Sequence, residues 1–262
     1  MKKLGGGQKA NISRCGFMPD FEQDIFDEII FAKQNFSFIE LTLKKDLKNY
    51  SKKCLGDIKQ ALKGFRVFGH LHWDIDLRDS RLTLAHLAVY HFLGIEQITI
   101  HPQMDVNLMP FVDFCRKNKI ILLIENSINP PLNSVDAFLS LFNEYPFLKM
   151  TFDLGHSFFI GSDSYEKFFQ TFTKSIKHIH LHYNYKRKID HLPFRNSILL
   201  VKVLAGLKKY GIKPTITLEI FEQLVGENKK ALSGQERHKV LIQQATMVNN
   251  SRNLLSAQKP KK

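Results

Sequence analysis

The sequence predicts an α/β protein folded as a (β/α)8 TIM barrel. Short apolar, β-branched runs alternate with longer stretches of helical periodicity, and the chain of 262 residues holds eight such units. From the second run onward, each run also carries a polar side chain near its end, where these barrels place their active sites. The expected strands are Ala10–Phe17, Phe36–Leu43, Arg66–Trp73, Gln97–His101, Ile120–Asn126, Lys149–His156, His178–Asn184 and Thr215–Phe221.

Two capping signals mark the starts of expected helices. Asp20 with Gln23, and Asp163 with Glu166, have the spacing of a capping box, in which the first residue and the residue three positions later cap the helix together. Apolar residues then recur on one face of each stretch. We therefore expect a helix to begin near each of these aspartates.

Glycines mark where two further helices should end. The helix Leu82–Leu93 precedes Gly94, and the helix from about Ile198 to Tyr210 precedes Gly211, both in the position usual for a C-terminal cap. The eighth helix is expected between Glu222 and Asn249, in one or two pieces. The alternative fold, an open doubly wound sheet, lacks its usual signature because no GxGxxG follows the first run.

The chain length suits one domain, which we place at residues 10–250, with flexible basic ends at 1–9 and 251–262. The formal net charge is +13, and 22 phenylalanines predict an aromatic-rich core. Two interpretations of the charge stay open. It is either a solvated basic surface or an attraction to phosphate, in a sugar phosphate or in nucleic acid.

Three features predict a cytoplasmic location. Cys15, Cys54 and Cys115 are odd in number and far apart, which indicates a reducing compartment. The first ten residues contain no apolar segment typical of a signal peptide. No apolar run approaches the roughly 18 residues that a membrane span requires. The sequence indicates no oligomeric state.

Four polar residues predict a metal site. Glu125, Asp153, His180 and Glu219 each stand at the end of a different apolar run. An isolated buried charge is costly, so carboxylates gathered in one place call for a counter-charge. Oxygen and imidazole ligands without thiolates suit zinc, manganese, magnesium or cobalt. We expect one divalent ion, held with positions open for substrate oxygens.

Other strand ends carry further polar residues. On the seventh run, alternation places two more histidines on the face of His180, one of which we expect to be a core residue. Helical histidines are expected on the surface. The candidates at the strand ends are Glu40, His70, His72, His101, His156, His178 and His182, and the helical histidines are His86, His91 and His238.

Several short motifs, taken in order, resemble the xylose isomerase-like TIM-barrel superfamily, which includes sugar phosphate isomerases and epimerases and the endonuclease IV family. The resemblance spans roughly Ile12 to Phe221. It rests on His-Pro after the fourth run, Glu-Asn after the fifth, Asp-x-Gly-His after the sixth, His-x-His-Leu in the seventh and Leu-Glu in the eighth.

The resemblance implies the same four metal ligands, Glu125, Asp153, His180 and Glu219. It also implies that Glu125 and Glu219 act as the catalytic acid/base pair on a small sugar substrate. The implied substrate-binding residues are Glu40, His70, His101 and His156, with Arg195 from the stretch that replaces the family's Gly-rich segment.

The endonuclease branch offers a second hypothesis, a metal-dependent enzyme acting at abasic sites in DNA. It uses up to three metal ions. The extra ligand positions would be His70, His101, His156 and His191, although the aspartate of its Asp-x-His motif is shifted here to Asp190.

A third hypothesis is a non-catalytic barrel that only binds a ligand. Two departures from the family motivate it. Tyr183 stands two positions after His-Leu, where an acidic residue is common, and the Gly-rich segment is missing. Two rim features are open to both functional and structural interpretations. Lys186–Lys188 could bind phosphate or be a solvated charge run, and Trp73 could form a wall for a sugar ring or simply pack.

Overall fold

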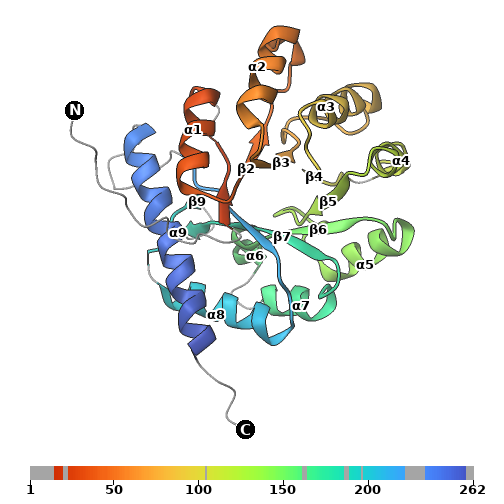
Figure 1. Ribbon diagram of the computed structural model, residues 1–262. Helices are drawn as coiled ribbons and strands as arrows, with labels where there is room; N and C mark the ends of the chain where they lie inside the picture. Colours follow the sequence, from red (N-terminus) through yellow and green to blue (C-terminus); the bar gives the residue numbers. More distant parts are fainter. Residues whose placement is uncertain are drawn as a thin grey trace, which may run out of the picture.

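The structure is a computed structural model that describes residues 15–19, 23–103, 105–160, 164–185, 189–195, 197–221 and 234–257. Strands and helices alternate along the chain (Figure 1). The strands are β1 (Cys15–Phe17), β2 (Phe38–Thr42), β3 (Arg66–His70), β4 (Gln97–Ile100), β5 (Ile121–Glu125), β6 (Lys149–Asp153), β7 (Ile176–Leu181), β8 (Tyr183–Tyr185), β9 (Ile189–Leu192) and β10 (Thr215–Leu218). The helices are α1 (Ile25–Asn35), η1 (Leu47–Asn49), α2 (Lys52–Leu62), α3 (Ser80–Phe92), α4 (Met109–Lys117), α5 (Val135–Glu144), α6 (Leu154–Ile160), α7 (Ser164–Thr171), α8 (Ser197–Lys209) and α9 (Gly234–Ala257).

Eight parallel strands close into a (β/α)8 barrel, which confirms the predicted fold. The order around the barrel is β1-β10-β7-β6-β5-β4-β3-β2, and β1 closes it by pairing with both β10 and β2. Figure 1 looks into the barrel, with the helices arranged around it. All eight expected runs form barrel strands. Their carboxyl ends therefore meet at one mouth, where side chains from distant parts of the chain can converge.

Some boundaries differ from those expected. Helix α1 begins at Ile25, because Asp24 is its cap: Asp24 Oδ1 accepts hydrogen bonds from the backbone N–H groups of Phe26, at 2.8 Å, and Asp27, at 3.2 Å. Asp20 and Asp163 lie outside the described residues. The two glycine stops are confirmed, since Gly94 and Gly211 have φ of +81° and +68°.

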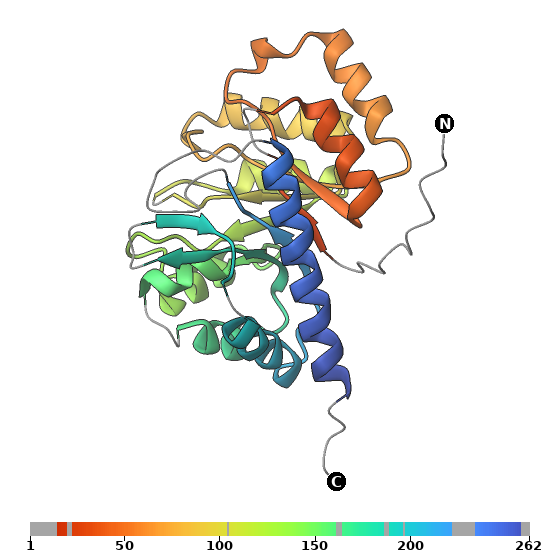
Figure 2. The same cartoon turned by 90° about the vertical axis from the view of Figure 1, so that its left-hand side faces the viewer.

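Helix α9 extends past residue 250, the expected end of the domain. It continues to Ala257, and both Ser251 and Leu255 are buried. Figure 2 shows α9, in dark blue, running along the side of the barrel. Residues 1–9, 222–233 and 258–262 lie outside the part of the chain that the structure describes.

Two elements were not anticipated from the sequence. Strand β6 stops at Asp153, and α6 begins at the next residue, so His156 lies on a helix and not on the strand. Beyond β7, β8 and β9 form a small antiparallel hairpin. Among the described residues, no helix is long and apolar enough to span a membrane.

The barrel interior is filled in layers. Near its amino-terminal end, the rings of Phe38 and Phe68 pack with centroids 4.6 Å apart. Gly16 permits this packing, since a Cβ there would lie 2.4 Å from the Phe38 ring. Above these rings comes a layer of buried polar side chains, and the mouth lies above that. The polar layer consists of Glu40, Thr99, Thr151, His178 and Thr217.

Phenylalanines also fill the space between the barrel and its helices, as predicted. Phe152 of β6 contacts Phe168 and Phe169 of α7, in each case with ring centroids 5.2 Å apart. Phe138 of α5 joins them at 6.0 Å from Phe168. All four rings are almost completely buried, so they contribute a large part of the hydrophobic stabilisation on this side of the barrel.

A buried arginine ties α9 to the barrel. Arg237 is completely buried and donates to Glu28 Oε2 of α1 at 2.8 Å. It also donates to the backbone carbonyls of Met18 at 2.6 Å and Ile220 at 3.2 Å, just beyond β1 and β10. Glu28 accepts a second bond, from His238, at 2.6 Å. Arg237 therefore joins three segments at the point where the barrel closes.

We predict that Arg237→Met destabilises the protein by about 3–5 kcal/mol, because it leaves the buried Glu28 carboxylate with too little counter-charge. Chemical denaturation measures the change. Lys239→Met, at an exposed position of the same helix, is the control and should stay within about 0.5 kcal/mol of the parent protein. Equal losses in both variants would contradict the assigned role of Arg237.

Candidate metal centre

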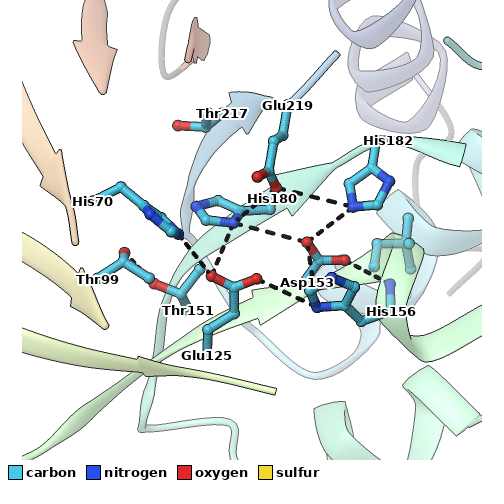
Figure 3. Close-up of polar contacts among 12 residues, drawn as sticks. His70, Thr99, Glu125, Thr151, Asp153, His156, His180, His182, Thr217 and Glu219 are labelled. Carbon is cyan, nitrogen blue, oxygen red and sulfur yellow. Dashed lines mark hydrogen bonds and ion pairs between the residues drawn. The ribbon is translucent and has the colours of Figure 1, made fainter. Parts of the chain in front are cut away.

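The four predicted ligands converge at the mouth of the barrel. One potential ligand atom from each of Glu125, Asp153, His180 and Glu219 lies within 4.8 Å of those of the other three. The four come from β5, β6, β7 and the residue after β10, so parallel pairing brings them together (Figure 3). All four side chains are buried, with Glu219 the most exposed at 6%.

His180 lies at the centre of this cluster. Its Nδ1 atom is 3.1 Å from Glu219 Oε2, 3.3 Å from Glu125 Oε2 and 3.8 Å from Asp153 Oδ2. Its Nε2 atom points the other way, toward Glu40 Oε1 at 3.2 Å. One edge of the imidazole thus faces three carboxylates, and the opposite edge faces the interior of the barrel.

Three atoms in this cluster are buried without a hydrogen bond: Glu125 Oε1, His180 Nδ1 and Glu219 Oε2. Buried polar atoms are normally hydrogen-bonded, so each exception requires an explanation. Here the atoms are carboxylate oxygens and an imidazole nitrogen that lie close together, which is the donor set preferred by divalent cations such as Zn²⁺ or Mn²⁺. The residues present therefore fit a divalent metal ion.

The electrostatics of the cluster favour positive charge at its centre. Burial opposes ionisation of Glu125, but His180 and His101 hold the pKa of this carboxyl well below its ordinary value. Burial also opposes ionisation of Glu219, but His180 and His191 hold the pKa of its carboxyl well below the ordinary value. Burial likewise disfavours the charged imidazole, yet Glu125, Glu40 and Glu219 raise the pKa of His180 well above its ordinary value. A divalent cation would supply more positive charge at the same point than a proton can.

Asp153 is held by Asn126, the residue after β5, and by His156 of α6. The side-chain amide of Asn126 donates to the Asp153 carbonyl at 2.9 Å, and its Oδ1 accepts from the Asp153 N–H at 2.7 Å. The backbone N–H of His156 donates to Asp153 Oδ1 at 2.6 Å. These bonds explain the Glu-Asn and Asp-x-Gly-His motifs, since they fix the backbone and the carboxylate of Asp153 together.

His156 has a defined tautomer. Its Nδ1 lies 2.8 Å from the Asn126 carbonyl, which can only accept, so Nδ1 carries the proton. In the neutral ring, Nε2 then carries the lone pair, which can bind a metal ion or accept a hydrogen bond from a hydroxyl group. Its side chain is 13% exposed, which is compatible with contact to a small ligand.

Sequence reasoning missed the role of His182 and Gly155. The backbone N–H of His191 donates to His182 Nδ1 at 3.2 Å, so Nε2 carries the proton and donates to Asp153 Oδ2 at 2.9 Å. The ring of His182 reaches Asp153 only because residue 155 is glycine: a Cβ there would lie 1.9 Å from His182 Cε1. The glycine of Asp-Leu-Gly-His could have signalled such a close approach.

Of the further groups with ligand spacing at the mouth, two add more than one residue to the central cluster. His70 and His101 both face Glu125 Oε2, at 3.1 Å and 3.4 Å, and this carboxylate belongs to the central cluster as well. The second group is His156, His182 and His191. Because both nitrogens of His182 are engaged, with Asp153 and with His191, His182 is poorly suited to be a ligand there.

Glu40 occupies a different place from the one expected. It is completely buried in the polar layer beneath the cluster, where His178, His180 and Thr217 surround its carboxylate. The expectation that Glu40 lines the substrate pocket does not fit this placement. His178 is the predicted core histidine: it is fully buried between Glu40 and Thr215.

The remaining candidates vary in placement. Arg195 and Trp73 are exposed, and Trp73 stacks on His72 with ring centroids 4.3 Å apart. The prediction of surface positions was wrong for His86, which is buried and bonded to the Lys45 carbonyl, and for His238, which stacks on Phe31 at 3.5 Å. His91 is exposed as expected. Residues 186–188 lie outside the described residues.

Comparison with known proteins agrees with the barrel fold. A family model described as "Xylose isomerase-like TIM barrel" matches residues 32–241. A search of curated proteins finds no match.

Among solved structures, an uncharacterized protein from Parabacteroides distasonis ATCC 8503 is 17% identical with a TM-score of 0.58, covering 95% of this chain and 100% of that chain. A protein from Sinorhizobium meliloti 1021 is 15% identical with a TM-score of 0.62, covering 92% of this chain and 98% of that chain. A xylose isomerase-like TIM barrel protein from Mycobacterium smegmatis, solved in complex with magnesium, is 13% identical with a TM-score of 0.57. The match covers 86% of this chain and 87% of that chain. At these identities the likeness shows the fold alone.

We predict that Gly155→Ala destabilises the protein by about 1–3 kcal/mol, because the new methyl group displaces His182 from Asp153. Chemical denaturation is again the measurement. Gly56→Ala provides the matched control: Gly56 lies in α2 with nothing within 4 Å of the added Cβ, so this change should be neutral or stabilise by up to about 1 kcal/mol. A neutral Gly155→Ala would refute the close-approach argument.

Proposed function

The chain belongs to the xylose isomerase-like TIM barrel family, and on that premise we propose that it is a divalent-metal-dependent isomerase or epimerase of a small sugar or sugar phosphate. The family includes sugar isomerases and epimerases and endonuclease IV. The observation that carries the proposal is the buried cluster of Glu125, Asp153, His180 and Glu219, with three ligand atoms that lack hydrogen bonds.

Those four residues would hold the metal ion. When bound, a divalent ion supplies Lewis acidity that polarises adjacent hydroxyl and carbonyl oxygens of a sugar and orients them. The magnesium in the Mycobacterium smegmatis protein supports a divalent ion in this fold. A nearby carboxylate can then take or return a proton at the carbon beside the carbonyl.

Glu125 and Glu219 suit the two halves of such a proton transfer. They approach His180 Nδ1 from different strands, each through its Oε2 atom. Their other oxygens lie near imidazoles, Glu125 Oε1 at 3.3 Å from His156 Nδ1 and Glu219 Oε1 at 3.4 Å from His191 Nε2. One carboxylate would remove the proton from carbon, and the other would deliver a proton to the neighbouring carbon or to the opposite face.

The histidines at the mouth would bind the substrate. His156 presents a lone pair at Nε2, which can accept a hydrogen bond from a sugar hydroxyl. His70 and His101 lie on the far side of Glu125 and would contact the other end of a short substrate. Arg195 is exposed and could pair with a phosphate group.

We expect the metal-loaded protein to exchange a carbon-bound hydrogen of a ketose or aldose with deuterium from heavy water, as followed by NMR over a panel of sugars and sugar phosphates. Glu219→Gln should slow this exchange by at least about 100-fold, because it removes one of the two proton carriers. Glu144→Gln, at an exposed carboxylate, should leave it unchanged. Absence of exchange across the panel, with metal saturating, would count against the proposal.

A second candidate function is a metal-dependent endonuclease acting at abasic sites in DNA. Its support is the pair of additional ligand-spaced groups, with Glu125 shared between the central cluster and His70 and His101. A carboxylate shared between two ligand groups suits a multi-metal hydrolase of phosphate esters. The net charge of +13 is also compatible with a DNA substrate.

The number of metal ions per chain, measured by elemental analysis of the purified protein, separates the two functions. One ion per chain favours the isomerase, and two or three favour the endonuclease. In the second case we expect nicking of abasic duplex DNA that disappears with chelator and in Glu125→Gln. Nicking that survives both treatments would point to a contaminating nuclease.

A further inference from the structure

Glu40 has the most complete set of hydrogen bonds of any carboxylate around the candidate metal centre. Its Oε1 lies 3.2 Å from His180 Nε2 and 3.3 Å from the Thr99 hydroxyl. Its Oε2 lies 2.8 Å from His178 Nε2 and 2.5 Å from the Thr217 hydroxyl. The side chain is completely buried, so every one of its partners comes from the protein.

A substrate cannot reach Glu40 without displacing these partners. His180 and the cluster at the mouth lie above it, and the rings of Phe38 and Phe68 fill the barrel beneath it, with Phe68 5.4 Å from the ring of His178. Glu40 must therefore act through the side chains that it touches, and His180 is the one among them that belongs to the cluster.

The Glu40 carboxylate determines which ring nitrogens of His178 and His180 carry protons. An ionised carboxylate only accepts hydrogen bonds, so His180 must present an N–H group to it at Nε2. His178 must do the same, and its Nδ1 then accepts from the Thr215 hydroxyl. The hydroxyls of Thr99 and Thr217 also donate to Glu40, so all four of its hydrogen bonds are accepted ones, as in an ionised carboxylate.

A proton held at Nε2 leaves Nδ1 of the neutral imidazole with its lone pair. That lone pair points toward Glu125, Asp153 and Glu219, where a cation would sit. In the opposite tautomer, an N–H group would occupy the ligand position and a lone pair would face the Glu40 carboxylate, which repels it. Metal-binding histidines generally have such a partner on the second nitrogen, and it orients the ring and raises its basicity.

We propose that Glu40 is a positioning residue: by accepting the Nε2 proton of His180, it fixes the ring so that Nδ1, and not Nε2, is the ligand atom for the divalent ion. This inference rests on the proposed metal-dependent function. It replaces the contact with substrate that the sequence suggested for Glu40.

The first experiment uses the unaltered protein. In protein labelled with ¹⁵N-histidine, NMR should detect a slowly exchanging proton on Nε2 of His180, identified by its loss in His180→Asn. The proton should be present in the metal-free and the zinc-saturated protein. An unprotonated Nε2 in either state would overturn the proposal. This result does not depend on catalytic activity.

The second experiment measures affinity for Zn²⁺ and Mn²⁺ by calorimetry. Glu40→Gln is nearly isosteric, but its amide offers one acceptor oxygen and turns an NH2 group toward one of its former donors. We expect metal binding about 10- to 100-fold weaker than in the parent protein. Thermal unfolding of each variant confirms that it is folded.

Thr99→Val is the matched control, because it removes a different hydrogen bond to the same carboxylate and does not touch His180. It should keep the metal affinity of the parent protein. Parent-like affinity in Glu40→Gln, or an equal loss in Thr99→Val, would overturn the positioning role. If the parent protein bound neither metal, the proposed function would fail, while the NMR experiment would still decide the role of Glu40.

Discussion

Four carboxylates, from Glu40, Glu125, Asp153 and Glu219, are buried around one imidazole at the mouth of the barrel. Negative charge packed this closely away from water is costly unless a cation balances it. Glu40 is satisfied by hydrogen bonds from the barrel interior, whereas Glu125 and Glu219 each retain a buried oxygen without one. The need for positive charge at this one point is the constraint on which the interpretation of the site depends.

The rest of the barrel holds the cluster in place from below and from the side. Aromatic rings close the lower part of the barrel, and Glu40, in the polar layer above them, orients His180. On the side of β6, Asn126 and His182 fix Asp153, and Gly155 leaves the space that His182 requires. Arg237 secures the closure between β1 and β10 by bonding to the carbonyls of Met18 and Ile220, and Ile220 directly follows Glu219. Rigid support of this kind keeps ligand atoms in position for a metal ion.

The sequence was sufficient for the fold and for the composition of the central cluster, because both depend on local patterns. Apolar runs alternate with helical stretches, and polar residues stand at the ends of the runs. It was not sufficient for contacts that depend on depth in the barrel or on distant segments. In the sequence, Glu40 resembles the other strand-end carboxylates, yet it lies one layer deeper in the barrel. Two buried partners of Arg237, Glu28 and Met18, are more than 200 residues away from it in the sequence.

The central claim is that Nδ1 of His180 and three carboxylates share one divalent ion. Anomalous diffraction from crystals of the protein grown with Zn²⁺, recorded at the zinc absorption edge, tests it most directly. We predict a strong peak bounded by Glu125, Asp153, His180 and Glu219, at about 2.0–2.1 Å from His180 Nδ1. A zinc-saturated crystal without a peak there, or with the ion bound through Nε2 of His180, would contradict the account.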